Sequence, residues 1–394
     1  MWWGDQARAD LTNQMFKLYE EKHPNIKIVG ETSPFDGYFD KLNTLLASGS
    51  APDIFALGSN IPDYVSKNVV LDLTPYVGKG LDVSNVPASL IDFNTVDGKM
   101  YGVTTGGNAR AFAVNTSVLE KAGIDVPNES WTWDDFAQIN GRVTQKLGKG
   151  YYGSYDPSGS YEEFETWLKQ RGKVIYDNEQ KKLGFQPADA AEWFQMWSDM
   201  RKSGAIVTAE EQVTSGTDAS KSLITQGKVA MLVIPSNQLA SYQKMTQDKL
   251  ILLPYPNGPQ GNGLAVQSGA SIVGYAKTEH AQEVASLMDF WLNDPEAIKI
   301  LGTNRGVPAS TKMIDVLRAD ASAEDQIIYD YLDLIGKNTN VKATINIPGY
   351  NEFAQLLMTA SQQVAFGKTS IQDAVNPFYE QAQKVLDINL KTAQ

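Results

Sequence analysis

The segment from Asp53 to Asn60 places hydrogen-bonding side chains at the end of a buried strand. Asp53-Ile-Phe-Ala-Leu57 is too apolar for a surface loop, and Gly58-Ser59-Asn60 follows it directly. Open α/β sheets bind ligands at the carboxyl ends of their strands. Ser59 and Asn60 are therefore candidates for hydrogen bonds to a polar ligand.

The residues before this strand predict the helix that positions it. Leu42 and Leu46 follow Tyr38 at helical spacing, which predicts one buried helix face. Gly49 can end the helix in a left-handed cap, and Pro52 prevents the helix from restarting. A helix, a tight turn and a buried strand in this order indicate an α/β architecture.

Composition excludes several function classes. The 394 residues carry a net charge of −12, which repels phosphate backbones and anionic membrane surfaces, so we expect no nucleic-acid partner. The chain has no cysteine and two histidines, which leaves almost nothing for a metal site. We expect no metal and no cofactor.

The remaining pattern predicts two α/β regions joined by crossing strands. A short strand at 2–3, a helix and a second strand at 25–30 form a βαβ opening. Small residues and alternation at 104–115 suggest a first crossing strand, and 264–275 a second one. After the second crossing, the hydrophobic periodicity is mainly helical.

Several short motifs, weak one by one, occur in an order that is hard to produce by chance. They are Tyr19-Glu-Glu-Lys-His-Pro-Asn-Ile-Lys-Ile, Lys41-Leu to Ala51-Pro-Asp-Ile-Phe, Asp97-Gly-Lys-Met-Tyr-Gly-Val, Phe112-Ala-Val-Asn-Thr, Trp131-Thr-Trp-Asp-Asp-Phe, Gly227-Lys-Val-Ala-Met and Arg305-Gly-Val-Pro-Ala-Ser. In these motifs the chain resembles the extracellular solute-binding proteins of bacterial ABC importers, in the carbohydrate-binding branch that includes maltose-binding protein.

This resemblance implies a type II periplasmic-binding-protein fold of class α/β, with two lobes that each hold a mainly parallel sheet flanked by helices. A sugar would bind in the cleft between the lobes. The expected lobes are residues 1–110 plus 271–311, and residues 116–264 plus 318–394. Hinge segments would lie near 109–115, 264–270 and 309–317.

The resemblance also implies an extracytoplasmic protein, either periplasmic or a cell-surface lipoprotein. Because the first strand is short, we expect that a signal segment, with or without a lipid-bearing cysteine, has been removed before Met1. The expected partners are an oligosaccharide and the membrane permease subunits of an ABC importer, and the receptor is expected to be a monomer.

A sugar needs charged or amide partners for its hydroxyls and an aromatic face for its C–H groups. On this basis and on family positions, the expected ligand-binding residues are Trp3, Asp5, Phe35, Asp36, Ser59, Asn60, Asn108, Tyr155, Asp156, Ser236, Asn237, Gln267, Ser268, Arg305, Tyr350 and Glu352. Several have plainer explanations: Asp5 and Asp36 can be helix caps, and Arg305 can be a structural arginine. We assign Trp131, Trp133, Trp193, Trp197 and Trp291 to the core.

The resulting expectation is a non-enzymatic receptor that closes on a neutral oligosaccharide of about two to four sugar units, in the size range of ordinary ligand pockets. A glycoside hydrolase is one alternative, with its two carboxylates drawn from Asp5, Asp36, Asp156 and Glu352. A receptor for a uronic-acid-containing oligosaccharide or a phosphate ester is another, with Arg110, Arg171 and Arg305 as its candidates.

Overall fold

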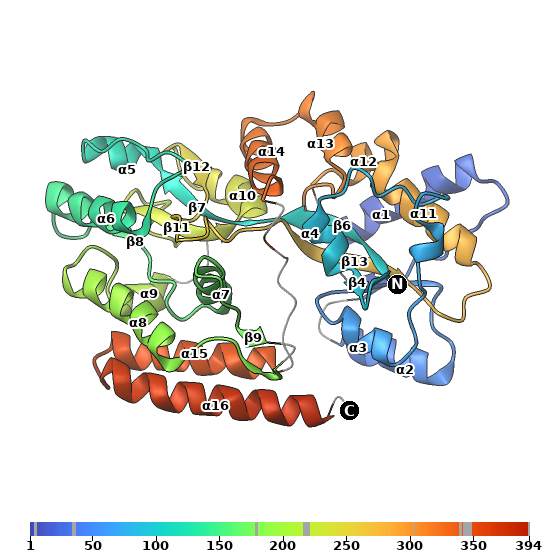
Figure 1. Ribbon diagram of the computed structural model, residues 1–394. Helices are drawn as coiled ribbons and strands as arrows, with labels where there is room; N and C mark the ends of the chain where they lie inside the picture. The colour runs from blue at the N-terminus through green and yellow to red at the C-terminus, as the bar shows by residue number, and fades with distance from the viewer. Residues whose placement is uncertain are drawn as a thin grey trace. The chain divides into compact units, whose positions relative to one another are not determined.

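A computed structural model describes residues 1–3, 6–33, 37–177, 180–215, 221–303, 305–338, 341 and 349–392. The chain divides into two compact units (Figure 1). Unit 1 comprises Met1–Ala109 and Ala265–Ile345, and unit 2 comprises Arg110–Leu264 and Asn346–Gln394. The chain therefore leaves unit 1 directly after Ala109 and returns to it at Ala265.

Unit 1 is built on a three-stranded antiparallel sheet. The central strand β13 (Gln267–Gly274) pairs with β3 (Ile54–Leu57) on one side and β6 (Gly102–Asn108) on the other. Two-residue strands β1 (Trp2–Trp3) and β2 (Thr32–Ser33) pair in parallel, and β4 (Thr95–Val96) pairs with β5 (Lys99–Met100). Buried Phe55, Leu57 and Val273 supply the apolar faces of the main sheet.

The helices of unit 1 come from both of its chain segments. They are α1 (Gln6–Lys22), α2 (Tyr38–Ser48), α3 (Ile61–Ser66), the 3-10 helix η1 (Thr74–Tyr76), α4 (Ala88–Phe93), α11 (Ala281–Asn293), α12 (Pro295–Leu301), α13 (Thr311–Arg318) and α14 (Ala323–Gly336). As predicted, Gly49 takes a left-handed conformation, with φ 71°, at the end of α2.

Unit 2 contains a mixed four-stranded sheet. Its order is β12-β7-β11-β8, from β12 (Leu250–Leu253), β7 (Arg110–Asn115), β11 (Val229–Pro235) and β8 (Tyr152–Ser154). β7 is antiparallel to both neighbours, and β11 is parallel to β8. A separate hairpin joins β9 (Tyr176–Asp177) to β10 (Lys182–Leu183).

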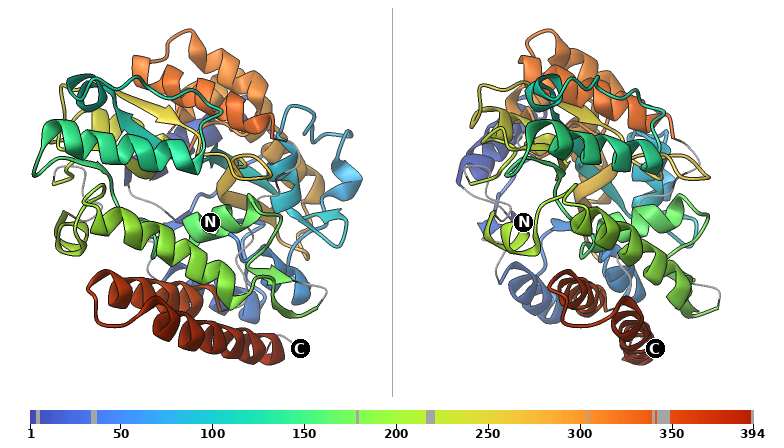
Figure 2. Two further views of the ribbon diagram at one scale, coloured as in Figure 1. Left: turned by 60° about the vertical axis from the view of Figure 1, so that its left-hand side comes forward. Right: turned by 90° about the vertical axis from the view of Figure 1, so that its left-hand side faces the viewer.

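The helices of unit 2 include two that follow the last passage of the chain between units. In chain order the helices are α5 (Thr116–Lys121), α6 (Trp133–Leu147), α7 (Tyr161–Lys169), α8 (Pro187–Lys202), α9 (Ala209–Ser215), the 3-10 helix η2 (Ser236–Gln238), α10 (Leu239–Gln243), α15 (Tyr350–Ala365) and α16 (Ile371–Thr392). The helices α15 and α16 lie side by side, with α8 next to them (Figure 2).

Four of the five tryptophans assigned to the core are buried, and Trp133 is half-buried. Trp193 and Trp197 are fully buried and meet edge to face at 5.4 Å between ring centroids, and Trp131 and Trp291 are also buried. Trp133 contacts both Trp193 and Trp197, so the aromatic side chains of α6 and α8 pack together. Each such ring removes a large apolar area from water.

Three details of the expected fold need correction. The sheets are not mainly parallel, because β13 and β7 run antiparallel to both of their neighbours. The predicted strand at 25–30 does not form, and β1 pairs instead with Thr32 and Ser33. The third passage between units does not fall at 309–317, because α13 packs on α11 and α12, and α14 packs on α13, within unit 1.

Candidate functional site

In unit 2, a polar cluster forms at the first turn of α7. A loop of Pro, Gly and Ser residues ends at Ser160, the N-cap residue, and Glu162 and Glu163 follow in the first turn, where the helix dipole favours carboxylates. Buried Phe164 and Leu168 fix the same helix in the core. The two carboxylates are therefore held on a rigid element.

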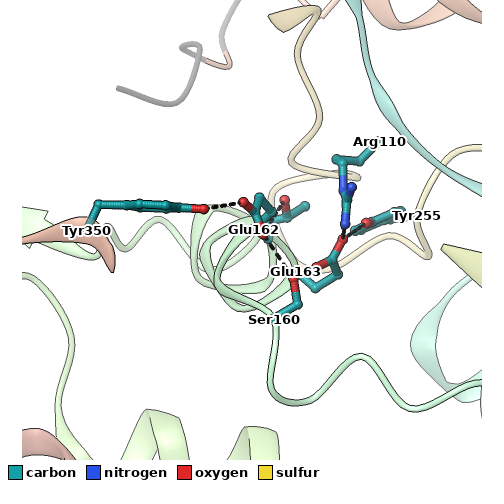
Figure 3. A network of polar contacts seen from close by, with 7 residues as sticks. Arg110, Ser160, Glu162, Glu163, Tyr255 and Tyr350 are labelled. Atoms are coloured by element: carbon teal, nitrogen blue, oxygen red, sulfur yellow. Dashed lines mark hydrogen bonds and ion pairs between the residues drawn. The ribbon is translucent and has the colours of Figure 1, made fainter. Parts of the chain in front are cut away.

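Tyr350 and Ser160 hold the Glu162 carboxylate (Figure 3). Tyr350 Oη donates a 2.6 Å hydrogen bond to Glu162 Oε1, and Ser160 Oγ donates one of 3.0 Å to Glu162 Oε2. Gly349, with φ 80°, starts α15 so that Tyr350 is its first residue, and the Tyr350 ring meets that of Tyr161 edge to face at 4.7 Å. The half-buried Glu162 is thus oriented from two directions.

Arg110, the first residue of unit 2, reaches the neighbouring Glu163 (Figure 3). Arg110 Nε donates a 2.8 Å hydrogen bond to Glu163 Oε1, and Arg110 Nη2 contacts the same oxygen. Tyr255 Oη donates to that oxygen as well, at 2.8 Å. The Glu163 side chain is 2% exposed and that of Arg110 is 22% exposed, so the pair is largely removed from water.

Electrostatics keep Glu162 and Arg110 charged at neutral pH. Burial alone would raise the pKa of Glu162, but the Tyr350 hydrogen bond and the Arg110 charge outweigh it, so its pKa lies below the usual value. Burial alone would lower the pKa of Arg110, but the charge of Glu163 outweighs this effect, so the pKa of Arg110 lies above its usual value. Burial and the hydrogen bond to Glu162 both raise the pKa of Tyr350, which keeps its proton to donate.

In unit 1, predicted polar residues meet at one end of the three-stranded sheet. Asn108 ends β6 directly opposite Gln267 at the start of β13, and Ser268 follows in the same ladder. Ser59 and Asn60 come after β3, at this same end, because β3 also runs antiparallel to β13. All five are half-buried. Ser268 Oγ lies 3.2 Å from Ser271 Oγ, and Asn60 Oδ1 accepts a 3.0 Å hydrogen bond from Gly58 N.

Tyr155 and Asp156, which we expected to contact ligand, are buried in unit 2 and bonded to neighbouring residues. Tyr155 is 4% exposed and packs on Val207 and Val229, and its hydroxyl accepts a 2.7 Å hydrogen bond from Leu223 N. Asp156 is 7% exposed and forms an ion pair with Arg201. A hydroxyl or carboxylate already bonded inside the core cannot easily turn toward a ligand, because its partner would be left unsatisfied.

The other predicted residues of unit 2 lie in varied environments. Ser236 is buried at the start of η2, whereas Asn237 and Glu352 are exposed. Asp5, Phe35 and Asp36 lie outside the described residues.

Trp3 and Arg305 also lie beside the three-stranded sheet of unit 1, where the Arg305 carbonyl oxygen approaches Gly106 of β6 and Gly269 of β13. Both line a cavity of about 680 Å³ whose walls include Ile26, Ile54, Leu287 and Trp291. The lining combines these apolar side chains with polar ones such as Lys27, Glu31 and Asp53.

Arg305 instead has the structural role that we considered as its alternative. Its Nη2 donates a 3.0 Å hydrogen bond to Thr12 Oγ1, and the guanidinium lies within 6 Å of the rings of Trp2 and Trp291.

Sequence reasoning missed Glu162 and Glu163 as site residues. The predicted residues of this region were Tyr155 and Asp156 in the preceding loop, although Glu162 and Glu163, which follow Ser160 and Tyr161, are an available signal. Arg110 was considered only as a partner for an acidic ligand. The cluster combines a fixed carboxylate acceptor, hydroxyl donors and aromatic rings, which are the groups that bind sugar hydroxyls and C–H faces.

A curated relative and two solved structures resemble this chain over most of its length. An arabinooligosaccharide-binding protein of Halalkalibacterium halodurans is 24% identical over 283 residues, which is 70% of this chain and 62% of the relative. An extracellular solute-binding protein family 1 structure from Alicyclobacillus acidocaldarius is 27% identical, with a TM-score of 0.86 over 98% of this chain and 97% of the other.

A periplasmic oligogalacturonide binding protein from Yersinia enterocolitica is 25% identical, with a TM-score of 0.84 over 98% of each chain.

None of the helices in the described ranges is long and apolar enough to cross a bilayer.

The family described as bacterial extracellular solute-binding protein matches residues 4–298, and its description places its members outside the cytoplasm. The match and the structural similarity confirm the predicted type II fold, and they confirm the prediction of a binding protein over that of an enzyme. The chain belongs to the bacterial extracellular solute-binding proteins, as its sequence motifs predicted.

Proposed function

We propose that this protein is the substrate-binding component of an ABC sugar importer and that its ligand is a neutral oligosaccharide of about two to four units, a size that ordinary ligand pockets hold. The observation that carries the proposal is the Glu162 carboxylate, which is fixed by Tyr350 and Ser160 on a buried helix. Such a preorganised acceptor suits sugar hydroxyls, because it loses little side-chain freedom on binding.

The relatives support an oligosaccharide and leave its charge to be decided. One binds arabinooligosaccharides and one binds oligogalacturonides, by their names. The arginines of unit 2 favour the neutral class. Arg110 forms an ion pair with Glu163. Arg171 Nη2 lies 3.4 Å from Glu192 Oε1, and Arg171 Cζ lies 3.6 Å from the centroid of the Trp167 ring.

In the proposed mechanism, residues of both units contact the sugar. Ser59, Asn60, Asn108, Gln267 and Ser268 of unit 1 would act together with Glu162 and Tyr350 of unit 2. Ligand binding then favours a closed state only to the extent that the ligand has contacts with both units in that state. The closed monomer would be the form that docks on the membrane permease.

A thermal-shift screen of neutral and acidic oligosaccharides tests this function. A ligand held at 100 times its dissociation constant adds about 2.7 kcal/mol to stability, which is easily detected. Stabilisation by neutral di- to tetrasaccharides is the expected result. Stabilisation by oligogalacturonides alone would favour the acidic alternative, and new reducing ends after incubation would indicate a hydrolase.

A further inference from the structure

The Arg110 guanidinium is charge-compensated inside unit 2. Arg110 Nε and Nη2 both contact Glu163 Oε1, and Tyr255 Oη donates to the same oxygen. The side chain of Arg110 keeps 22% of its surface exposed, whereas Glu163 lies beneath it at 2%. Arg110 therefore presents a guanidinium at the surface of the cluster, and its counter-charge lies below.

The second carboxylate oxygen of Glu163, Oε2, is buried without a hydrogen bond from any described residue, so Glu163 acts mainly through its charge on Arg110. Within the described parts of the chain, no donor reaches the buried Glu163 Oε2. A buried carboxylate oxygen without a hydrogen bond is costly, and the ion pair with Arg110 compensates for it. With Glu162 nearby, the cluster holds one cation and two carboxylates, so its formal charge is −1.

We propose that Glu163 determines the class of sugar that this site accepts, because it turns the Arg110–Glu162 cluster from a neutral pair into a net anion. This inference rests on the proposed function, in which the sugar binds at Glu162. A uronic acid carries a carboxylate that the net negative cluster repels. A neutral sugar has only hydroxyls, for which Glu162 and Tyr350 are suitable partners.

Replacement of Glu163 by glutamine tests the charge with little change in shape. The amide oxygen of E163Q can still accept hydrogen bonds from Arg110 and Tyr255, while the cluster loses one negative charge. A unit charge several ångströms away in a partly solvated site changes the affinity for a charged ligand by about tenfold. The affinity for digalacturonate should rise by about that factor, and the affinity for a neutral trisaccharide should stay nearly constant.

Glu192→Gln is the matched control. Glu192 is the exposed partner of Arg171 on α8, so E192Q removes the same charge from another arginine pair of unit 2. Isothermal titration calorimetry of wild type, E163Q and E192Q with digalacturonate and with arabinotriose gives the affinity ratio of acidic to neutral ligand. An increase in this ratio in E163Q alone supports the role of Glu163. An equal ratio in all three proteins, or an equal increase in E192Q, overturns it.

The wild-type protein provides a second test that does not depend on the folding of a variant. Salt screens repulsion, so raising NaCl from about 20 mM to about 500 mM should increase the ratio of digalacturonate to arabinotriose affinity. A ratio that falls with salt would mean that the site attracts acids, which overturns the inference.

Failure of the proposed function is distinguishable from failure of the role of Glu163. A wild type that binds neither sugar overturns both. A wild type that binds arabinotriose and discriminates against digalacturonate, together with an E163Q variant that discriminates equally, overturns the role of Glu163 alone.

Discussion

The hydrogen bond from Tyr350 to Glu162 gives the sharpest test of the candidate site. Tyr350→Phe removes one hydroxyl and leaves the ring against Tyr161. Hydrogen bonds to charged groups contribute roughly 1.5–3 kcal/mol, and the half-buried position of Glu162 reduces this to about 1–2 kcal/mol by solvent screening. We expect Y350F to be less stable than wild type by that amount at neutral pH, measured by urea denaturation.

The loss in Y350F should depend on pH with a defined sign. The pKa of Glu162 in the folded protein is lower than its ordinary value of 4.5, so its ionised form stabilises the fold above that pH. This stability is lost as the pH falls through the folded pKa. The difference between wild type and Y350F should therefore narrow from about pH 7 to about pH 3.

Tyr379→Phe is the control for this experiment. Tyr379 Oη donates a 3.2 Å hydrogen bond to the neutral carbonyl of Phe185, also within unit 2. Its removal should cost about 1 kcal/mol or less, with no dependence on the protonation of Glu162. If Y350F loses no more stability than Y379F, or if its loss is the same at every pH, the Glu162 contact is not the charge-assisted bond that we describe.

Further predictions concern a buried ion pair and two glycines in the folded units. Asp156→Asn should destabilise unit 2 by about 3 kcal/mol, because it leaves the buried Arg201 without its counter-charge, and thermal unfolding with a sugar titration should show a lower Tm but an unchanged Kd. Gly106→Ala should prevent stable folding, since its Cβ would lie 2.3 Å from the Arg305 carbonyl oxygen, whereas Gly141→Ala in α6 has open space and should stabilise by about 0.5–1 kcal/mol. Soluble yield and Tm of the two glycine variants check this contrast, and equal behaviour would contradict it.

Local sequence patterns predicted the helices well. The spacing of Tyr38, Leu42 and Leu46 identified α2, because an amphipathic helix repeats its buried positions every three or four residues. The directions of neighbouring strands were harder to predict from the sequence. An apolar strand such as β12 has the same sequence pattern whether its neighbour is parallel or antiparallel. The mixed sheets therefore became evident only from the structure.

The candidate site was predicted only in part, for a physical reason. Tyr350 was among the predicted ligand-binding residues, but its partner Glu162 lies 188 residues earlier in the chain. The pairing of Arg110 with Glu163 spans 53 residues, and the sequence gives no sign of which carboxylate an arginine will meet. The pairing of Asp156 with Arg201 was equally out of reach, because it depends on the packing of α8.

The most direct test of the central claim is a calorimetric titration of the wild-type protein with a panel of neutral di-, tri- and tetrasaccharides. The account predicts saturable binding of at least one of them with a dissociation constant of about 1 μM or tighter, equivalent to about −8 kcal/mol, with the sugar recovered intact. An absence of binding to every neutral saccharide, alongside tight binding of digalacturonate, would contradict it.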